Sequence, residues 1–132
     1  MTWPLQGLGA ITLFSEDLGA SKRFYGDVLG LRTVYEDDNS AVFDLGNTIV
    51  NVLAATEAVD LIAPATVSGP DAGARSQLTI WVDDADATCA QLAGHGVTLL
   101  NGPMTRPWGQ RTATFRDPAG HIWDIAQTLP PG

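Results

Sequence analysis

The feature that most constrains this chain is an order of predicted elements that occurs twice. In the first half, the strand-like stretch GAITLFS at 9–15 precedes a helical pattern and three further strand-like stretches. In the second half, QLTIWVDD at 77–84 precedes a shorter helical pattern and again three strand-like stretches. Because chance rarely preserves both order and spacing, the repeat predicts an α+β fold made of two β-α-β-β-β modules.

The spacing of single residues supports this repeat. Residues of the first strand and the helix start match at one constant offset, namely Ile11, Leu13 and Asp17 with Leu78, Ile80 and Asp84. Residues of the later hairpin match at a second offset, namely Asp44, Asn51 and Val52 with Asp117, Asp124 and Ile125. We therefore expect one domain over 1–132, with module one at about 8–55, a linker at about 56–75 and module two at about 76–128.

Local signals place the helices and the linker. Asp17 precedes the first helical pattern, and Gly30 follows it as a residue suited to the left-handed conformation of a helix stop. The second helix is expected to end near His95 and Gly96. The stretch between the modules is rich in Ala, Pro, Gly and Asp and shows no strong periodicity of its own, which predicts a linker.

Composition and charge narrow the classes of partner. The net charge of −8 disfavours nucleic acid and anionic membranes, which bind basic surfaces. No apolar run approaches the roughly 20 residues of a membrane span, and the N-terminal residues show no secretory signal. The single cysteine, Cys89, has no partner for an internal disulfide and no companions at zinc-ligand spacing. A cytoplasmic protein is therefore expected.

Asp124 is the residue that most needs a chemical explanation. It lies in the middle of HIWDIAQ at 121–127, an apolar stretch that predicts a buried strand, with Trp123 on the opposite face under a helix. A carboxylate buried there needs a partner. The sequence leaves three partners open: a metal, an organic ligand, or Arg111 or Arg116, which flank the neighbouring strand.

The chain resembles the vicinal oxygen chelate superfamily, which includes glyoxalase I, bleomycin-resistance proteins and extradiol dioxygenases. The stretches that carry the resemblance are ITLFSEDLGASKRFYGDVLGL, LTIWVDDADATCAQL and WGQRTATFRDPAGHIWDIAQ. The resemblance implies two βαβββ modules whose sheets curl into an open barrel around a cavity, often completed by a partner in a homodimer.

Enzymes of this superfamily usually bind a divalent metal through four strand positions, which fall on Ala10, Asn51, Gln77 and Asp124. Ala10 has no donor atom, and one carboxylate with two amides is a poor set for zinc, iron or nickel. We therefore expect neither a metal nor another cofactor.

The same resemblance decides which faces of the strands line the cavity. Phe14 and Trp81 then occupy corresponding inward places, where two aromatic rings suit a planar ligand or fill the core. Trp108, in a loop, is expected at the rim of a site. The predicted ligand-binding residues are Phe14, Asn51, Gln77, Trp81, Trp108 and Asp124.

The function predicted from these features is metal-independent binding of a planar or cationic small molecule, similar to the drug-binding resistance proteins of the superfamily. The alternative is a glyoxalase-like lyase or isomerase, or a dioxygenase-related enzyme, in which Asp124 is a general base. A homodimeric domain with a degenerated pocket is the third reading.

Overall fold

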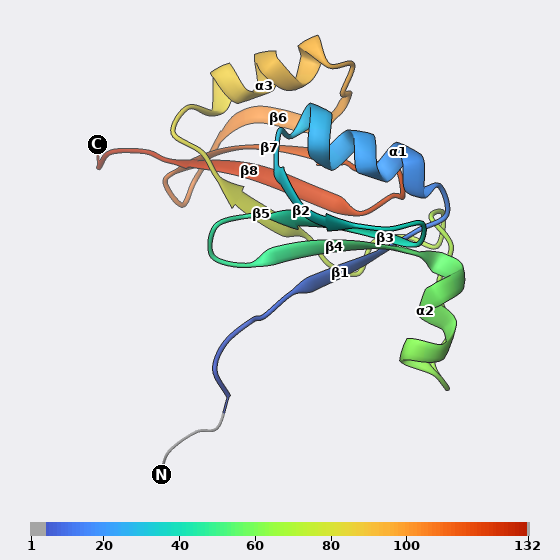
Figure 1. The fold of residues 1–132 in the computed structure, drawn as a ribbon. Coiled ribbons are helices and arrows are strands. Elements are labelled where there is room, and N and C mark those ends of the chain that lie inside the picture. The colour runs from blue at the N-terminus through green and yellow to red at the C-terminus, as the bar shows by residue number, and fades with distance from the viewer. Residues whose placement is uncertain (1–4, 132) are drawn as a thin grey trace. The chain divides into compact units, whose positions relative to one another are not determined.

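The computed structural model describes residues 5–131, and the chain divides into two compact units, one up to Val67 and one from Ser68 onwards. Each unit contains one four-stranded mixed sheet with helical segments beside it (Figure 1). Within residues 5–131, no helix has the length and apolar character that a membrane crossing requires.

The first unit has the strand order β1-β4-β3-β2. Its strands are β1 (Ile11–Ser15), β2 (Arg32–Glu36), β3 (Ser40–Asp44) and β4 (Ile49–Ala54). β1 runs parallel to β4, and the other neighbours are antiparallel. Helix α1 (Leu18–Arg23) continues into a π-helical turn, η1 (Phe24–Val28), and α2 (Ala55–Ile62) follows β4.

The second unit has the equivalent strand order β5-β8-β7-β6. Its strands are β5 (Leu78–Trp81), β6 (Leu99–Arg106), β7 (Gln110–Arg116) and β8 (Ile122–Thr128), with helix α3 (Ala85–Gly94) between β5 and β6. β5 runs parallel to β8, as β1 does to β4. The predicted α+β fold and the repeated β-α-β-β-β order are confirmed.

The helix starts and stops also follow the sequence signals. Asp17 Oδ1 accepts a hydrogen bond from the Ala20 N–H at 3.1 Å, and Asp84 Oδ1 accepts one from the Ala87 N–H at 3.0 Å. Gly30 has a φ of 69° after the first helix, which is the left-handed conformation that glycine adopts without strain. The matched aspartates therefore act as helix N-caps in both modules, where they accept a hydrogen bond from an otherwise free backbone N–H group.

The core of each unit lies between the sheet and its helix. In the first unit the largest fully buried side chains are Tyr25, Phe43, Val50 and Val52. In the second unit they are Phe115 and Trp123, with Ile125 and Leu92 nearly as buried. Trp123 lies on the face of β8 toward α3, as expected, because it alternates with Asp124.

The structure corrects two expectations. The stretch expected to be a linker without strong periodicity begins with a helix, α2, which continues directly from the end of β4 (Figure 1). Only its Ala58 is buried. The sequence does place apolar residues of this segment at helical spacing, namely Ala55, Ala58, Val59 and Ile62, but the segment has only eight residues and a Pro- and Gly-rich stretch follows it. The sequence comparison also matched Asp44 with Asp117. In the structure Asp44 corresponds instead to Arg116, one residue earlier, because Asp44 pairs with Ile49 in the first hairpin and Arg116 pairs with Ile122 in the second.

Candidate functional site

The second sheet has one face toward α3 and one face away from it. Alternation along β7 and β8 sends Ala113, Phe115, Trp123 and Ile125 toward the helix. The Gln127 Oε1 atom on this side accepts a hydrogen bond from the Ala85 N–H at 2.8 Å. The opposite side, which we call the open face, has two central rows of residues aligned across the strands, with Arg116 and Ile122 beyond one row and Arg106, Gln110 and Thr128 beyond the other. The first row is Thr79, Asp124, Thr114 and Asn101, and the second is Trp81, Ala126, Thr112 and Met104.

Asp124 lies near the centre of the open face and is 9% exposed. Thr79 Oγ1 donates a hydrogen bond of 2.5 Å to Asp124 Oδ1 from the neighbouring strand β5. Within residues 5–131, Asp124 Oδ2 accepts no hydrogen bond and the carboxylate has no cationic partner. A buried carboxylate with a single hydroxyl partner retains the capacity to bind a cation or another donor.

The hypothesis that Arg111 neutralises Asp124 is wrong. Arg111 pairs across the sheet with Gln127, so its side chain lies on the α3 side. There its Nε and Nη2 atoms each donate to a carboxylate oxygen of Asp86 at 2.9 Å. This hydrogen bonding lowers the pKa of Asp86 and raises that of Arg111.

Arg116 does not neutralise Asp124 either. It has the alternation of Thr114, which places it on the open side of β7, but its side chain is exposed at the end of the strand. No ion pair joins it to Asp124 within the described part of the chain. Of the three partners considered for Asp124, the arginine is therefore excluded and the ligand and metal remain.

The second row of the open face combines large exposed side chains at its edges with small buried ones between them. Trp81 on β5 is 65% exposed, while Ala126 and Thr112 at the centre are buried. A pocket of about 260 Å³ lies beside Trp81 and is lined by Trp81, Val82, Asp83, Ala126, Gln127 and Thr128. An exposed indole beside a pocket offers a flat apolar surface to a planar ligand.

Arg106 is a residue of this face that the sequence interpretation missed. Its Nε donates to Thr112 Oγ1 at 3.0 Å and its Nη2 donates to Asn101 Oδ1 at 3.2 Å. The guanidinium carbon lies 5.8 Å from the ring centre of Trp108, which is 66% exposed in the β6–β7 turn. The adjacent Trp108 in RPWGQ and the two-residue alternation of β6 are the signals that could have identified it.

The remaining predicted residues lie elsewhere. Phe14 is half-buried on β1, and Asn51 on β4 pairs with Thr12, so both belong to the equivalent face of the first sheet. Asn51 Oδ1 is buried and has no hydrogen-bond partner within residues 5–131. Gln77 is exposed and immediately precedes β5. Trp81 and Asp124 thus share one face with Trp108 at its edge, whereas Phe14 and Asn51 share the other sheet.

The residues at the family's metal positions do not fit a divalent ion. Ala10 has no donor, and Asp124 Oδ1 is already bound by the Thr79 hydroxyl. Asn51 and Gln77 add only neutral amides, which leaves one carboxylate to offset the charge of the metal. Among residues 5–131 there is also no group of three or more His, Cys, Asp or Glu side chains that could hold a metal.

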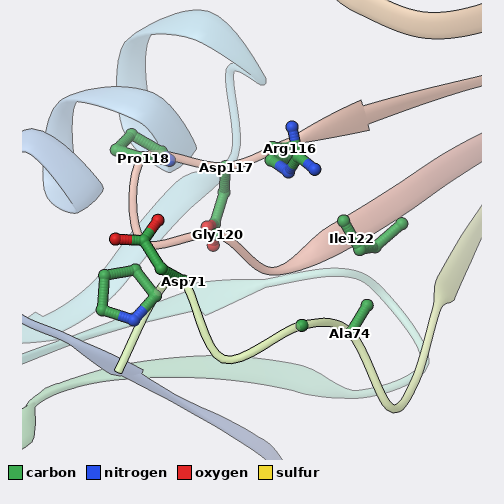
Figure 2. A pocket seen from close by; sticks show the side chains of 9 residues that line it. Asp71, Ala74, Arg116, Asp117, Pro118, Gly120 and Ile122 are labelled. Atoms are coloured by element: carbon green, nitrogen blue, oxygen red, sulfur yellow. The ribbon is translucent and has the colours of Figure 1, made fainter. Parts of the chain in front are cut away.

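A larger pocket of about 420 Å³ lies at the end of the second sheet, away from Asp124. It is lined by Pro70, Asp71, Gly73, Ala74, Arg116, Asp117, Pro118, Gly120 and Ile122. Figure 2 shows the chain at Asp71 and Ala74 passing beside Gly120 and Ile122. Asp117 Oδ1 accepts hydrogen bonds from the Ala119 and His121 N–H groups at 2.9 Å each, so this carboxylate stabilises the turn between β7 and β8.

Comparison with solved structures supports the fold. A glyoxalase/bleomycin resistance protein/dioxygenase from Nocardioides has a TM-score of 0.86 at 21% identity, covering 99% of this chain and 89% of that one. A lactoylglutathione lyase from Agrobacterium tumefaciens has a TM-score of 0.75 at 22% identity, covering 94% and 95%. TnmS3, an antibiotic binding protein from Streptomyces sp. CB03234, has a TM-score of 0.73 at 22% identity, covering 96% and 99%.

The sequence itself carries the family assignment. The model of the Glyoxalase/Bleomycin resistance protein/Dioxygenase superfamily matches residues 7–125, which include module one, most of module two and every predicted ligand-binding residue. The resemblance inferred from the repeated modules is therefore confirmed, and the chain belongs to the Glyoxalase/Bleomycin resistance protein/Dioxygenase superfamily.

Proposed function

We propose that this chain is a metal-independent binding protein for a planar, cationic small molecule, and that the open face of the second sheet is its binding surface. The observation that carries the proposal is Asp124, a carboxylate that is 9% exposed and has no cationic partner within residues 5–131. Burying such a charge is costly unless a counter-charge or hydrogen bonds compensate. A protonated amine of a ligand would supply that counter-charge.

The arrangement around Asp124 suits a bound molecule better than a solvated surface. The Thr79 hydroxyl holds Oδ1, which fixes the carboxylate and leaves Oδ2 for a ligand donor. Trp81 lies one strand away and two residues further along, beside the pocket of about 260 Å³. We propose that the ring of the ligand stacks on Trp81 while its amine reaches Asp124, with Trp108 and Gln77 at the rim.

The relatives support a binding role of this kind. One structural neighbour is described as an antibiotic binding protein, and bleomycin resistance is part of the family description. The donor set at the metal positions favours recognition without a metal, because it offers only one carboxylate.

Calorimetric titration with planar cationic antibiotics, bleomycin among them, tests the proposal. We expect saturable binding that weakens about tenfold in Asp124→Asn, which keeps the shape and removes the charge. Asp60→Asn is the matched control, because it changes the net charge equally at an exposed position of α2 in the other unit. Equal losses in both variants, or no binding across the panel, would contradict the proposal.

Intrinsic fluorescence gives an independent measurement. A ligand stacked on Trp81 should quench the emission of the wild-type protein, and Trp81→Phe should remove most of that quenching. Trp123 is buried toward α3 and should contribute little to the change. Quenching that persists fully in Trp81→Phe would refute stacking of the ligand on Trp81.

The second candidate is an enzyme of the glyoxalase type, in which Asp124 acts as a general base. The free Oδ2 of the hydrogen-bonded carboxylate is the observation that favours it, since a base needs an open proton acceptor. A structural neighbour described as a lactoylglutathione lyase belongs to the same fold. Metal content measured on the purified protein discriminates between the two. A stoichiometric divalent ion that is lost in Asp124→Asn, together with activity on lactoylglutathione, would reverse the ranking.

We further propose that the protein is a cytoplasmic homodimer. The two sheets have edge strands at β1, β2, β5 and β6, and pairing of such an edge with a second copy would satisfy its backbone groups. Light scattering of the purified protein should give twice the monomer mass of 13.9 kDa. A mass that stays at the monomer value over the accessible concentration range would refute this part of the proposal.

A further inference from the structure

The open face carries a half-buried arginine whose charge is not balanced by a carboxylate. Arg106 is bound by Thr112 and Asn101, which are neutral, and packs near the Trp108 ring. Within residues 5–131 it takes part in no ion pair. The chain has 15 acidic residues against seven basic ones, so a carboxylate partner for an arginine is easily supplied. Three exposed arginines, Arg23, Arg75 and Arg116, also take part in no ion pair within residues 5–131, but Arg106 differs from them because its side chain is half-buried.

Arg111 provides the contrast on the same hairpin. It is equally half-buried, but on the α3 side, and there both oxygens of the Asp86 carboxylate accept its N–H groups. The half-buried arginine on the α3 side therefore has a carboxylate partner that accepts through both oxygens. Arg106 is instead held by two neutral acceptors, which fix the plane of its guanidinium and leave its other N–H groups without an acceptor in the described part of the chain.

An arginine fixed in this way is preorganised for an anion. The flat fork of a guanidinium matches the two oxygens of a carboxylate, and binding costs less entropy when the side chain is already held. Trp108 limits access to one side of the guanidinium and supports its position. Its own Nε1–H donates to Gln110 Oε1 at 3.0 Å, so the indole is also fixed.

The position of Arg106 relative to Asp124 defines the spacing of the two charges. Asp124 is on β8, Thr112 and Thr114 are on β7, and Asn101 and Arg106 are on β6. The guanidinium bonds Asn101, which is in the same row as Asp124 and two strands away from it. Since neighbouring strands lie about 4.8 Å apart, the two charged groups are about 10 Å apart across the face.

We propose that Arg106 is a specificity-determining residue that binds a carboxylate of the ligand, so that the ligands are planar compounds with an amine and a carboxylate at opposite ends. This inference rests on the proposed function, in which Asp124 binds the amine. The strand order β5-β8-β7-β6 places Trp81 and Arg106 on opposite sides of Asp124, so the part of the ligand between its amine and its carboxylate lies over β7 and not on Trp81. The two charges of the face then discriminate between compounds that carry both groups and those that carry only one.

Three biphenyl probes test this inference by titration calorimetry at neutral pH. One carries an aminomethyl group, one a carboxylate, and one both groups at opposite ends, where their separation is comparable to that of the two charged residues. We expect the probe with both groups to bind wild-type protein about tenfold more tightly than the amine alone. In Arg106→Gln this advantage should disappear, while the affinity for the amine probe should not fall, because a repelling positive charge has been removed.

Two further variants make the result specific. Arg106→Lys keeps the charge and loses the fork, and we expect it to retain only part of the advantage. Arg111→Gln removes a positive charge from the opposite side of the same hairpin and should leave the advantage unchanged. The thermal midpoint of each variant, measured by circular dichroism, shows whether it is folded under the conditions of the titration.

The outcomes separate this inference from the proposed function. If the amine probe binds and depends on Asp124, but the carboxylate adds nothing or its contribution survives in Arg106→Gln, the role of Arg106 is refuted and the proposed function stands. If none of the probes binds the wild-type protein, both are refuted for planar compounds of this size.

Discussion

The two modules share a backbone plan but fill their cores from different elements. In the first module the helical segment supplies the large side chains Phe24 and Tyr25, and the strand position on β4 holds Val50. In the second module α3 buries only small or medium side chains, and the equivalent position on β8 holds Trp123. The comparison shows that large core side chains come from the helical segment in the first module and from the strand in the second.

The faces away from the helices differ more than the cores do. The first sheet has Thr12, Asn51, Val42 and Tyr35 in the row that corresponds to Thr79, Asp124, Thr114 and Asn101 of the second. The amide of Asn51 is replaced by the charged Asp124, and Arg106 supplies a second charge close to that row. A duplicated backbone has thus kept its helix signals and packing, whereas the chemistry of this face has diverged.

The largest effect should come from truncating the strand-supplied core of the second module. Trp123 is 1% exposed, and Trp123→Ala should lower the free energy of unfolding by about 4 kcal/mol, since it removes a large ring and leaves a cavity. Val50 is 0% exposed at the equivalent position, and Val50→Ala should lose only about 2 kcal/mol. Urea denaturation of the two variants measures the difference. Equal losses would contradict the idea that core volume comes from different elements.

A smaller difference should separate the glycines of the two equivalent turns. Gly46 and Gly120 have φ values of 91° and 93°, so alanine is strained at both. At Gly120 an added Cβ would also lie 2.9 Å from the Pro70 carbonyl oxygen, whereas nothing lies within 4 Å at Gly46. We expect Gly120→Ala to lower the free energy of unfolding by about 2 kcal/mol and Gly46→Ala by about 1 kcal/mol. Urea denaturation of both variants tests this, and a larger loss at Gly46 would contradict the contact with Pro70.

Asn51 allows a test of whether an unpaired polar atom is retained for binding. Its Oδ1 is buried without a partner within residues 5–131, so Asn51→Leu should raise the free energy of unfolding by about 1 kcal/mol. If Asn51 contacts the ligand, as the sequence predicts, the same variant should bind a planar cationic antibiotic more weakly. Thermal unfolding and calorimetry on the same samples measure both effects. A more stable variant with unchanged binding would remove Asn51 from the predicted ligand-binding residues.

The features of the fold that were predicted correctly depend on local sequence patterns, such as helix caps and the alternation of residues along a strand. Asp17 and Asp84 indicate where the helices begin, and alternation along β8 correctly places Trp123 and Asp124 on opposite faces of the sheet. The helix α2 was missed because it spans only eight residues and precedes a Pro- and Gly-rich stretch that is typical of a linker, although its apolar residues do lie at helical spacing. The one-residue displacement of Asp117 was missed because both aspartates accept a backbone N–H two residues ahead, so their local chemistry is the same.

The candidate site was harder to predict because it depends on pairing across strands. Arg111 forms its ion pair with Asp86 because its pairing with Gln127 places its side chain on the α3 side. A single sequence does not specify this strand register. Arg106 joins the open face only because the bulged β6 brings its guanidinium to Asn101 and Thr112. Non-local register of this kind decides which charges meet, whereas periodicity decides only which side of a strand they take.

The smallest expected effect concerns two exposed carboxylates that the modules stabilise differently. In the first module the Gly46 N–H, and then Arg32, lower the pKa of Asp44, whereas in the second Arg111 lowers the pKa of Asp86. A depressed pKa in the folded state means that each carboxylate stabilises the protein above its unfolded pKa of about 4, and that this contribution is lost as the pH falls through the folded value. Asp44→Asn and Asp86→Asn should therefore lower the thermal midpoint near pH 7, by less than about 4 °C, and match wild type in strong acid.

Added salt should change the effects of Asp44→Asn and Asp86→Asn on the thermal midpoint to different extents. The main partner of Asp44 is an uncharged backbone N–H, so the effect of Asp44→Asn should persist in about 0.5 M NaCl. The main partner of Asp86 is the charged Arg111, and its pair is exposed on the Asp86 side, so the effect of Asp86→Asn should shrink under the same conditions. Thermal midpoints at low and high salt, measured at neutral and acidic pH, test both statements. Equal salt sensitivity of the two variants would mean that the same kind of interaction stabilises both carboxylates. It would contradict the distinction between a backbone N–H partner for Asp44 and a charged partner for Asp86.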